Sequence, residues 1–341
     1  MSKQFFRRSI LDGFSFGFLI TIVFVYFLFP TEEPLTKVNF FTSIFTAAFF
    51  VGVGISALLV KYGYKTLGEH LFQPEYKRAL DTKSFIKTFW GWHFIILLIC
   101  LFVIGVQKTQ FSIFELLDRD GFEGAKRLFN DIIHPNWAVL PSAILNIIET
   151  IFMAFMATLL AIPFAFFLSF AAARNIMNGK VSFWVYLALR TVFNIARSIE
   201  AILWAIIFSV WVGIGPFAGM LALMIHSVAS LAKQYSEMVE TVYDGPIEGV
   251  QSCGANKLQT IWFAIVPQVV LPYISFTVYR WDINIRMATI IGLVGGGGIG
   301  TMLIQYQGQA MWPEVGTIII VISVVVWIMD QASAFIREAL K

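Results

Sequence analysis

Residues 237–267 read EMVETVYDGPIEGVQSCGANKLQTIWFAIVP, an acid-rich and weakly hydrophobic stretch inside a very apolar sequence. Gly254 follows Glu248, and Pro267 opens the next apolar run. Because Gly commonly follows the last turn of a helix and Pro commonly stands in the first, the pattern predicts a helix that ends at Gly254 and a second, short helix after it. The stretch therefore predicts a compact polar knob between two membrane spans.

The composition around this stretch is that of a polytopic membrane protein. Hydrophobic residues make up 58% of the chain and charged residues 13%, and the mean hydropathy is +0.77. We therefore predict an all-α fold embedded in the bilayer. The net charge of +3 is small and spread over loops, so it gives no reason to expect nucleic acid as a partner. The histidines have no metal-ligand spacing and no nucleophile motif is present, so we expect neither a metal site nor catalytic residues.

Apolar runs of span length recur along the chain. A helix needs about 20 apolar residues to cross the hydrocarbon core, and the runs predict about eight spans. The first run lacks a small-residue cleavage site, so we expect it to be retained as a span. The fifth and sixth runs meet at Gly213–Pro216, where Gly and Pro favour a turn. The predicted spans are 13–30, 38–60, 88–107, 150–173 (entered from about 141), one within 181–212, 217–232, 266 to about 294, and 315–329.

Basic residues in the short loops predict the orientation. Lys and Arg concentrate on the cytoplasmic side of membrane proteins. They are frequent in residues 1–9 and in the loop 61–87, whereas the loops of opposite parity contain few or are balanced by acids. Both termini are therefore expected in the cytoplasm, and span parity places the 237–267 knob there too. The location that follows is multi-pass, in the plasma (inner) membrane of a bacterium.

The chain has one predicted seam. Residues 1–85 form a two-span hairpin with a basic cytoplasmic loop, and residues 86–341 form a core of six spans that includes the segment 237–267. Several roles are open for the hairpin: it can pack beside the core, regulate it or recruit a partner. The basic residues of the loop can also simply hold the hairpin against anionic lipid.

Acidic residues make the knob unsuited to lipid. Glu237, Glu240, Asp244 and Glu248 cannot face the hydrocarbon, so this segment must contact water or protein. A short helix that lies in a groove of a partner transmits rigid-body motion well. The alternative is an ordinary solvated loop.

Other charges lie within apolar helices. Ionisable groups at membrane depth are costly and usually face a protein interior or an aqueous path. Asp282 and Arg286 share a helix face and Arg197 and Glu200 are three apart, so these pairs either fix helix packing or line an anion route. Arg190 and Arg280 have no obvious local acid partner, which favours the route for them. The candidate path residues are Arg190, Asn194, Arg197, Glu200, Arg280, Asp282, Asn284 and Arg286.

From about residue 88 to the end, several blocks resemble the permeases of phosphonate-type ABC transporters. The blocks occur in the order of that family, and they cover roughly three-quarters of the chain. The first 85 residues exceed what the core of the family needs, and Gly249 and Val250 stand where that family usually has two alanines. The blocks are Arg190-Thr-Val-Phe-Asn-Ile-Ala-Arg197 with Glu200, Gly213-Ile-Gly-Pro-Phe-Ala-Gly219 with Ala222, Leu223 and His226, Gly245-Pro246-Ile-Glu248 with Gly254-Ala255, Tyr279-Arg-Trp-Asp-Ile-Asn-Ile-Arg286, and Gly292-Leu-Val-Gly295 with Gly297-Gly298-Ile-Gly300.

The resemblance implies the transmembrane subunit of a type I ABC importer that works by alternating access. It implies a homodimer, two ATPase subunits that bind ATP and Mg²⁺, and a periplasmic or lipid-anchored binding protein; no cofactor is expected on this chain. The substrate would be a phosphonate or a related oxyanion such as phosphite or phosphate. The residues that would dock the ATPase are Glu237, Glu240, Asp244, Gly245, Pro246, Glu248, Gly254 and Ala255.

The glycine run 292–300 has the spacing of a phosphate loop without its chemistry. Thr301 stands where the lysine of such a loop is needed, and the run follows a membrane helix instead of a strand. We predict a turn or re-entrant break at the outer face, with Gly295, Gly297, Gly298 and Gly300 as hinge or gate. The backbone N–H groups of this turn could instead meet an anion.

A stand-alone ion-coupled secondary transporter or channel is the alternative function. It would use Asp282, Glu200 and Asp330 as ion-coupling groups. No inverted repeat is visible, and the acid-rich knob would have no purpose in such a protein. A membrane enzyme acting on phosphorus-containing lipids lacks a nucleophile and base.

Overall fold

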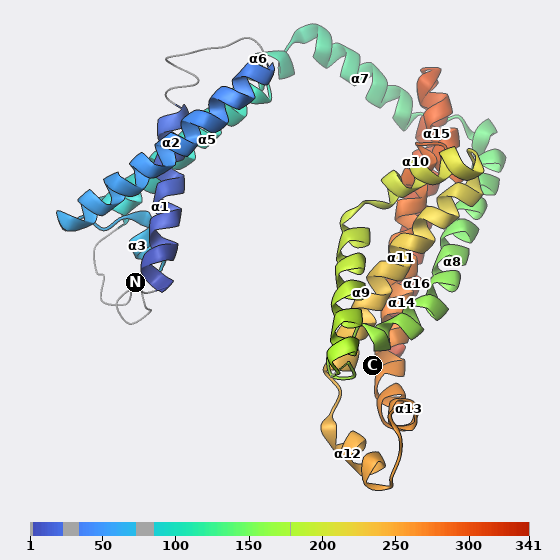
Figure 1. The fold of residues 1–341 in the computed structure, drawn as a ribbon. Helices are drawn as coiled ribbons and strands as arrows, with labels where there is room; N and C mark the ends of the chain where they lie inside the picture. The colour runs from blue at the N-terminus through green and yellow to red at the C-terminus, as the bar shows by residue number, and fades with distance from the viewer. Residues whose placement is uncertain (1–2, 23–33, 73–84, 178, 341) are drawn as a thin grey trace. The chain divides into compact units, whose positions relative to one another are not determined.

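A computed structural model describes residues 3–22, 34–72, 85–177 and 179–340. These residues form helices and no strand, which confirms the predicted all-α class. The chain divides into two compact units, Met1–Gly121 and Phe122–Lys341. The first is coloured blue to green-blue in Figure 1, and the second runs from green to red.

The N-terminal unit is built on a helix pair. Helix α1 (Lys3–Ile22) packs along α2 (Pro34–Lys61), and Gly17 allows the approach because a Cβ there would lie 2.9 Å from the Phe49 backbone. The other helices of the unit are α3 (Leu67–Leu71), α5 (Phe89–Lys108), which follows a 3₁₀ turn at Phe85–Lys87, and α6 (Ile113–Leu116).

A buried carboxylate ties these helices together. Asp12 of α1 is fully buried and accepts hydrogen bonds from Ser56 Oγ of α2 at 2.6 Å, Thr66 Oγ1 at 2.6 Å and the Gly68 amide of α3 at 2.7 Å. A buried charge is tolerated when donors surround it in this way. On α5, His93 stacks on Phe16 of α1 with ring centroids 4.0 Å apart. Helix α5 therefore belongs to this unit.

This division differs from the seam expected near residue 85. We assigned the helix at 88–107 to the C-terminal core, but its packing partners are α1 and α3. The predicted boundary near residue 85 follows from the number of spans that a permease core needs. That number does not tell whether a given helix packs on the N-terminal hairpin or on the C-terminal bundle. The basic residues Lys77, Arg78 and Lys83 and the second half of the first predicted span (13–30) lie outside the described residues.

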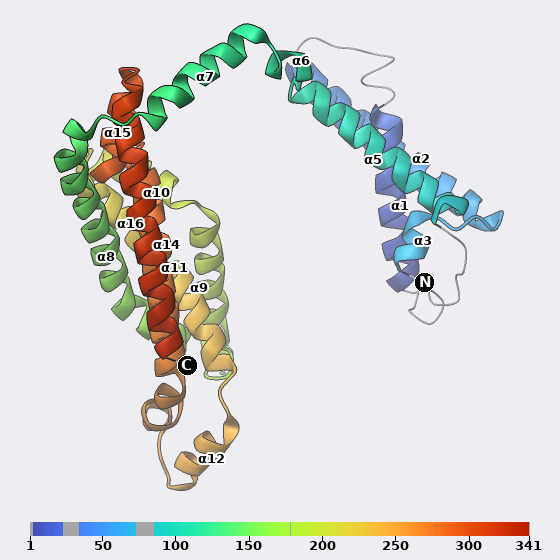
Figure 2. The ribbon, with the colours of Figure 1, turned by 180° about the vertical axis from the view of Figure 1, so that it is seen from behind.

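The C-terminal unit is a helix bundle centred on α11 (Pro216–Glu240). This helix packs on α8 (Leu140–Ala171) and α14 (Val266–Gly292), and Figures 1 and 2 show these three running side by side with α16 (Trp312–Ala339). Alanine, glycine, serine and threonine make up most of the buried positions of α8 and α11, and small side chains let membrane helices approach closely. The other elements are α7 (Arg119–Ile133), a 3₁₀ turn at Trp137–Val139, α9 (Lys180–Ser198), α10 (Ala201–Val212), α12 (Asp244–Ser252), α13 (Lys257–Thr260), a π-helical turn at Ile261–Ile265 and α15 (Gly298–Gly308).

Most predicted spans correspond to long helices. Six described helices are long and apolar enough to cross a membrane, and a bent pair would add a seventh. The bent pair corresponds to the span predicted within 181–212, but it is bent: α9 and α10 meet at an angle of 90°, as in a broken span or a re-entrant loop. The break lies at Ile199, whose φ of −89° and ψ of 117° are extended and cannot continue a helix. The predicted turn at Gly213–Pro216 is present, with φ of 92° at Gly213 and 152° at Gly215.

Candidate functional site

The polar knob consists of α12 and α13, which lie at the end of the bundle nearest the C-terminus (Figure 1). Gly254 joins them with a φ of +80°, and its amide donates to Gln251 O at 2.9 Å. A non-glycine residue rarely adopts this φ, so the turn requires glycine. Asn256 then caps α13 reciprocally with Gln259. The predicted helix–turn–helix is therefore confirmed, and no residue of α12 is buried.

The base of the knob is fixed to the bundle. The Tyr243 amide donates to Gln268 Oε1 of α14 at 3.0 Å, and Asn175 Nδ2 donates to Val239 O of α11 at 2.6 Å. The π-helical turn leads from α13 directly into α14. Asp244, Gly245, Pro246 and Glu248 lie on α12 and Ala255 lies in the turn, so the structure brings these predicted docking residues together. The knob is thus continuous with α14 through the π-helical turn, and a hydrogen bond from Tyr243 ties its start to the same helix.

Glu237 and Glu240 lie elsewhere, in the last turn of α11. Glu240 Oε1 accepts from Arg190 Nη1 of α9 at 2.7 Å and from the Arg174 amide at 2.9 Å. Glu237 Oε1 is 3.8 Å from Arg190 Nη2. Arg190 has no local acid partner, as the spacing indicates, but two acids reach it from another helix, which local spacing cannot reveal. These contacts favour a packing role for Arg190 over the route expected for it. These three side chains hold α9 to α11 and do not lie on the knob.

A buried polar cluster crosses the middle of the bundle. Asn284 of α14 is fully buried and donates through Nδ2 to Thr158 Oγ1 of α8 and to Ser227 Oγ of α11, both at 2.8 Å. Arg280 lies one turn away, is 7% exposed and donates from Nε to Ser227 Oγ at 3.2 Å. Its Nη2 atom is buried and has no hydrogen-bond partner within the described part of the chain. The cluster therefore contains a guanidinium whose Nη2 donors have no acceptor among the described residues.

The bend between α9 and α10 lies beside this cluster. Its Ile199 carbonyl is 3.2 Å from His226 Nδ1 of α11. Arg197 and Glu200, which flank the bend, both act electrostatically on His226 and on Arg280. The bend thus brings Arg197 and Glu200 to the same region as Arg280, although they make no ion pair with each other among the described residues. Their side chains are exposed in the single chain.

Sequence reasoning missed two members of this region. Ser227 joins Arg280 to Asn284, and Lys233 of α11 donates from Nζ to Asn194 Oδ1 of α9 at 3.0 Å. Lys233 lies next to the predicted span 217–232, and a lone charge at the edge of an apolar run could have identified it as a candidate functional residue. Ser227 gave no signal, because serine is common in membrane helices.

Asp282 and Arg286 form a separate group. Arg286 Nη2 lies 2.6 Å from Asp282 Oδ2 on the same helix, as their spacing predicts, and 3.7 Å from Asp330 Oδ1 of α16. One guanidinium therefore bridges two carboxylates on two packed helices. This arrangement favours the packing interpretation for the pair over the route.

The glycine-rich turn lies at the other end of α14 from the knob. Gly295, Gly297 and Gly298 have φ of +86°, +80° and +69°. The amides of Gly298 and Ile299 already donate to Glu149 Oε1 and Thr150 Oγ1 of α8, at 3.3 Å and 2.9 Å. These two N–H groups are therefore engaged, which removes them from any anion site in this turn. At Gly300 an added Cβ would lie 2.1 Å from Thr289 O, so this glycine permits close packing of α15 on α14.

Comparisons with known proteins match mainly the C-terminal unit. The family described as "Binding-protein-dependent transport system inner membrane component" matches residues 165–340. The phosphite transport system permease protein PtxC of Stutzerimonas stutzeri is 31% identical over 247 residues, which cover 72% of this chain and 86% of that protein. The phosphate-import permease protein PhnE of Mycolicibacterium smegmatis is 30% identical over 62% of this chain and 40% of its own length. Among solved structures, an inward-facing form of the MetNI methionine ABC transporter shares the fold with a TM-score of 0.53 at 18% identity, over 60% of this chain and 99% of that one.

Proposed function

Given that this chain belongs to the family of binding-protein-dependent transport system inner membrane components, we propose that the ABC importer it serves takes up a phosphorus oxyanion. The chain is the permease subunit of that importer. Phosphonate, phosphite and phosphate share the feature that matters for recognition, a compact group of anionic oxygens. The relatives named for phosphite and phosphate support this substrate class.

Arg280 is the observation that carries the substrate proposal. Its guanidinium is buried among membrane helices and one nitrogen lacks a partner among the described residues. An unpaired buried donor of this kind is costly unless a ligand uses it. Hydrogen bonds between arginine and an oxyanion are charge-assisted and short. We infer that Arg280 receives an oxyanion that passes along α14, with Arg197, which acts electrostatically on Arg280, as a further cation.

The importer assembles from two copies of this chain with two ATPase subunits and a substrate-binding protein. The exposed charges at the bend between α9 and α10, Arg197 and Glu200, would line a route closed by the second copy at a two-fold axis. The ATPases would hold the exposed α12 of each knob and bind ATP and Mg²⁺ themselves. Their closure would draw the two knobs together and open the outer face, so this chain moves substrate and catalyses no reaction.

Two of the acids that an ion-coupled transporter would use are paired with a cation in the described part of the chain. Asp282 and Asp330, two of the groups that such a protein would use, are bridged by Arg286. The single guanidinium ties both carboxylates into the packing of α14 against α16, and we retain the ATP-driven importer.

The test reconstitutes the chain with its cognate ATPase and binding protein. ATP hydrolysis is measured with phosphonate, phosphite, phosphate or methionine loaded on the binding protein. We expect stimulation by a phosphorus oxyanion and none by methionine. Stimulation by methionine would overturn the substrate class, and failure of the ATPase to associate would overturn the assembly.

A further inference from the structure

Helix α7 keeps apolar and polar side chains on opposite sides. A helix makes about 3.6 residues per turn, so side chains three, four and seven positions apart share a face. One side of α7 carries the apolar residues Phe122, Ala125, Leu128, Phe129, Ile132 and Ile133. The other side carries Glu123, Arg127, Asn130 and Asp131. Residues from Phe122 onward belong to the C-terminal unit, and the proposed function assigns no role to this helix.

The apolar side of α7 is left open by the described part of the chain. Phe122, Phe129 and Ile133 are 65%, 63% and 71% exposed. Among the described residues no other helix packs along α7. A continuous stripe of large apolar side chains is unfavourable in water, and such a stripe marks a contact with a protein or with the membrane.

The C-terminal end of α7 is fixed to the bundle, at the end opposite the knob (Figures 1 and 2). The backbone of α16 at Gly316 lies so close to the Ile132 carbonyl that a Cβ would not fit between them. Just after the helix, Asn136 donates from its amide to Pro313 O at 3.0 Å and from Nδ2 to Glu314 Oε1 at 2.9 Å. The end of α7 is therefore held at the first turns of α16.

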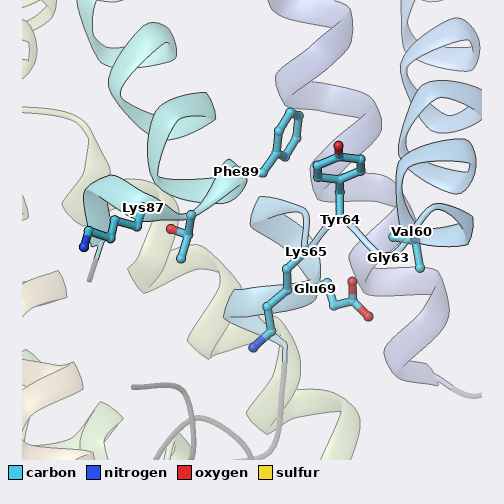
Figure 3. Close-up of a pocket in the computed structure, with 8 residues that line it drawn as sticks. Val60, Gly63, Tyr64, Lys65, Glu69, Lys87 and Phe89 are labelled. Atoms are coloured by element: carbon cyan, nitrogen blue, oxygen red, sulfur yellow. The ribbon is translucent and has the colours of Figure 1, made fainter. Parts of the chain in front are cut away.

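Aromatic residues mark this level as the edge of the hydrocarbon. The candidate spans Trp137–Ala171 and Trp312–Ala339 both begin with tryptophan, and Trp137 is exposed. Tryptophan and tyrosine concentrate at the two interfaces of a bilayer. The N-terminal unit has a similar feature, since Tyr64 and Phe89 pack with ring centroids 5.7 Å apart where α5 begins (Figure 3). The fixed end of α7 thus lies at the depth where headgroups meet acyl chains.

We propose that α7 lies in the interface of the membrane leaflet opposite the knob, with Phe122, Phe129 and Ile133 among the upper acyl carbons and the charged side in water. The apolar stripe meets lipid and not a soluble protein, because it is anchored at the depth where the candidate spans of α8 and α16 begin. Helix α7 contains three basic and three acidic residues, so its insertion rests on apolar burial and does not require anionic lipid. This inference is independent of the transported substrate, and either can fail alone.

The test places a fluorophore on either side of α7 in the full-length chain, reconstituted in nanodiscs of phosphatidylcholine. The native Cys100 and Cys253 are replaced by serine. Bimane is then attached at Ala125→Cys on the apolar side or at Arg127→Cys on the polar side, and both variants leave the large apolar side chains in place. We expect brominated phosphatidylcholine to quench the label at Ala125→Cys, and aqueous iodide to quench the label at Arg127→Cys.

A second pair of variants measures the strength of insertion. Phe122→Ser/Phe129→Ser should shift the label at Ala125→Cys from lipid to water, by about tenfold or more in the ratio of the two quenching constants. The matched control is Glu123→Ser/Arg127→Ser, which removes an exposed pair 4.0 Å apart from the polar side and should leave the ratio unchanged. A minor fraction of phosphatidylglycerol should also leave it unchanged.

Two results would overturn the proposal. Equal quenching by iodide at Ala125→Cys and Arg127→Cys, without quenching by brominated lipid, would show that α7 stands in water. Protection of Ala125→Cys from iodide only after addition of the substrate-binding protein would assign the stripe to that protein. Lipid quenching that is confined to Ala125→Cys and lost in Phe122→Ser/Phe129→Ser supports the interfacial helix.

Discussion

Arg280 and Arg190 both lie in apolar helices, but their surroundings favour a packing role for Arg190 and a substrate-binding role for Arg280. Arg190 is held by Glu240 and Glu237, whereas Arg280 keeps a buried nitrogen without a partner among the described residues. The sequence could indicate that both are unusual, because a charge in an apolar run is visible in one dimension. It could not separate them, since the acids that hold Arg190 come from a helix distant in the chain.

We predict that Arg280→Gln lowers the rate of substrate uptake about tenfold or more, by removal of a charge-assisted hydrogen bond to the oxyanion. Assembly with the ATPase should persist, because Asn284 still links α8, α11 and α14. Uptake into proteoliposomes and co-purification of the ATPase measure the two effects. Arg190→Gln is the comparison and should instead lower thermal stability; unchanged uptake in Arg280→Gln would contradict the role of Arg280.

Two glycines of α15 also differ in their surroundings: Gly300 packs closely on α14, whereas Gly308 has open space where a Cβ would lie. Gly300→Ala would place a Cβ 2.1 Å from Thr289 O, so α15 must move away from α14. We expect a loss of about 1–3 kcal/mol in the free energy of unfolding. Gly308→Ala, at the end of the same helix, meets nothing within 4 Å and should change stability by less than about 0.5 kcal/mol. Thermal unfolding of the purified chain in detergent compares the two, and equal melting temperatures would show that the close approach is dispensable.

Among the helices, the knob was predictable and the bend between α9 and α10 was not. The knob is specified by local chemistry: Gly254 supplies the positive φ, and Asn256 and Gln259 cap the next helix. The bend at Ile199 has neither Gly nor Pro at its centre, and its surroundings on α11 stabilise it. Apolar content alone therefore predicted a span within 181–212 but not the bend at Ile199.

The Gly254 turn gives a prediction about coupling to ATP hydrolysis, and Gly249 on the neighbouring helix provides a matched control. Gly254→Val should leave the chain in the membrane but uncouple ATP hydrolysis from uptake, because a β-branched residue at φ +80° is strained by about 1–3 kcal/mol and the turn must change shape. Gly249→Ala on α12 has a helical backbone and open space around its Cβ, so coupling should be preserved. Hydrolysis and uptake are measured together in proteoliposomes; full coupling in Gly254→Val would contradict a docking role for the knob.

For the molecule as a whole, sequence predicted the class, the family, the six long apolar helices and, apart from its bend, the bent pair that the structure describes. The first of the eight predicted spans, 13–30, lies partly outside the described residues. Sequence did not predict which helices pack into which unit, because α5 has the same apolar character whether it packs on α1 or on the bundle. The orientation rests on basic loops and span parity, and two native cysteines can test it.

Cys253 is exposed on the knob, whereas Cys100 lies within the candidate span Phe89–Lys108. We predict that a membrane-impermeant maleimide labels Cys253 in inverted membrane vesicles and does not label it in intact cells. Cys100 should resist labelling in both, since thiolate in the hydrocarbon is scarce. The Cys100→Ser variant isolates the signal of Cys253, and labelling from outside intact cells would place the knob on the opposite face.

Helix α14 is one element of 27 residues, about 40 Å long. It begins at the knob, carries Arg280 and Asn284 in its middle and ends at the glycine-rich turn. If an anion at Arg280 binds two positions of this helix with different affinity, a partner that prefers one position changes the affinity for the anion. Thermodynamic reciprocity then requires the anion to change the affinity for the partner by the same factor. Anion binding at Arg280 would then change the affinity of the knob for the ATPase through α14, the same helix that would transmit movement of the ATPase to the transport route.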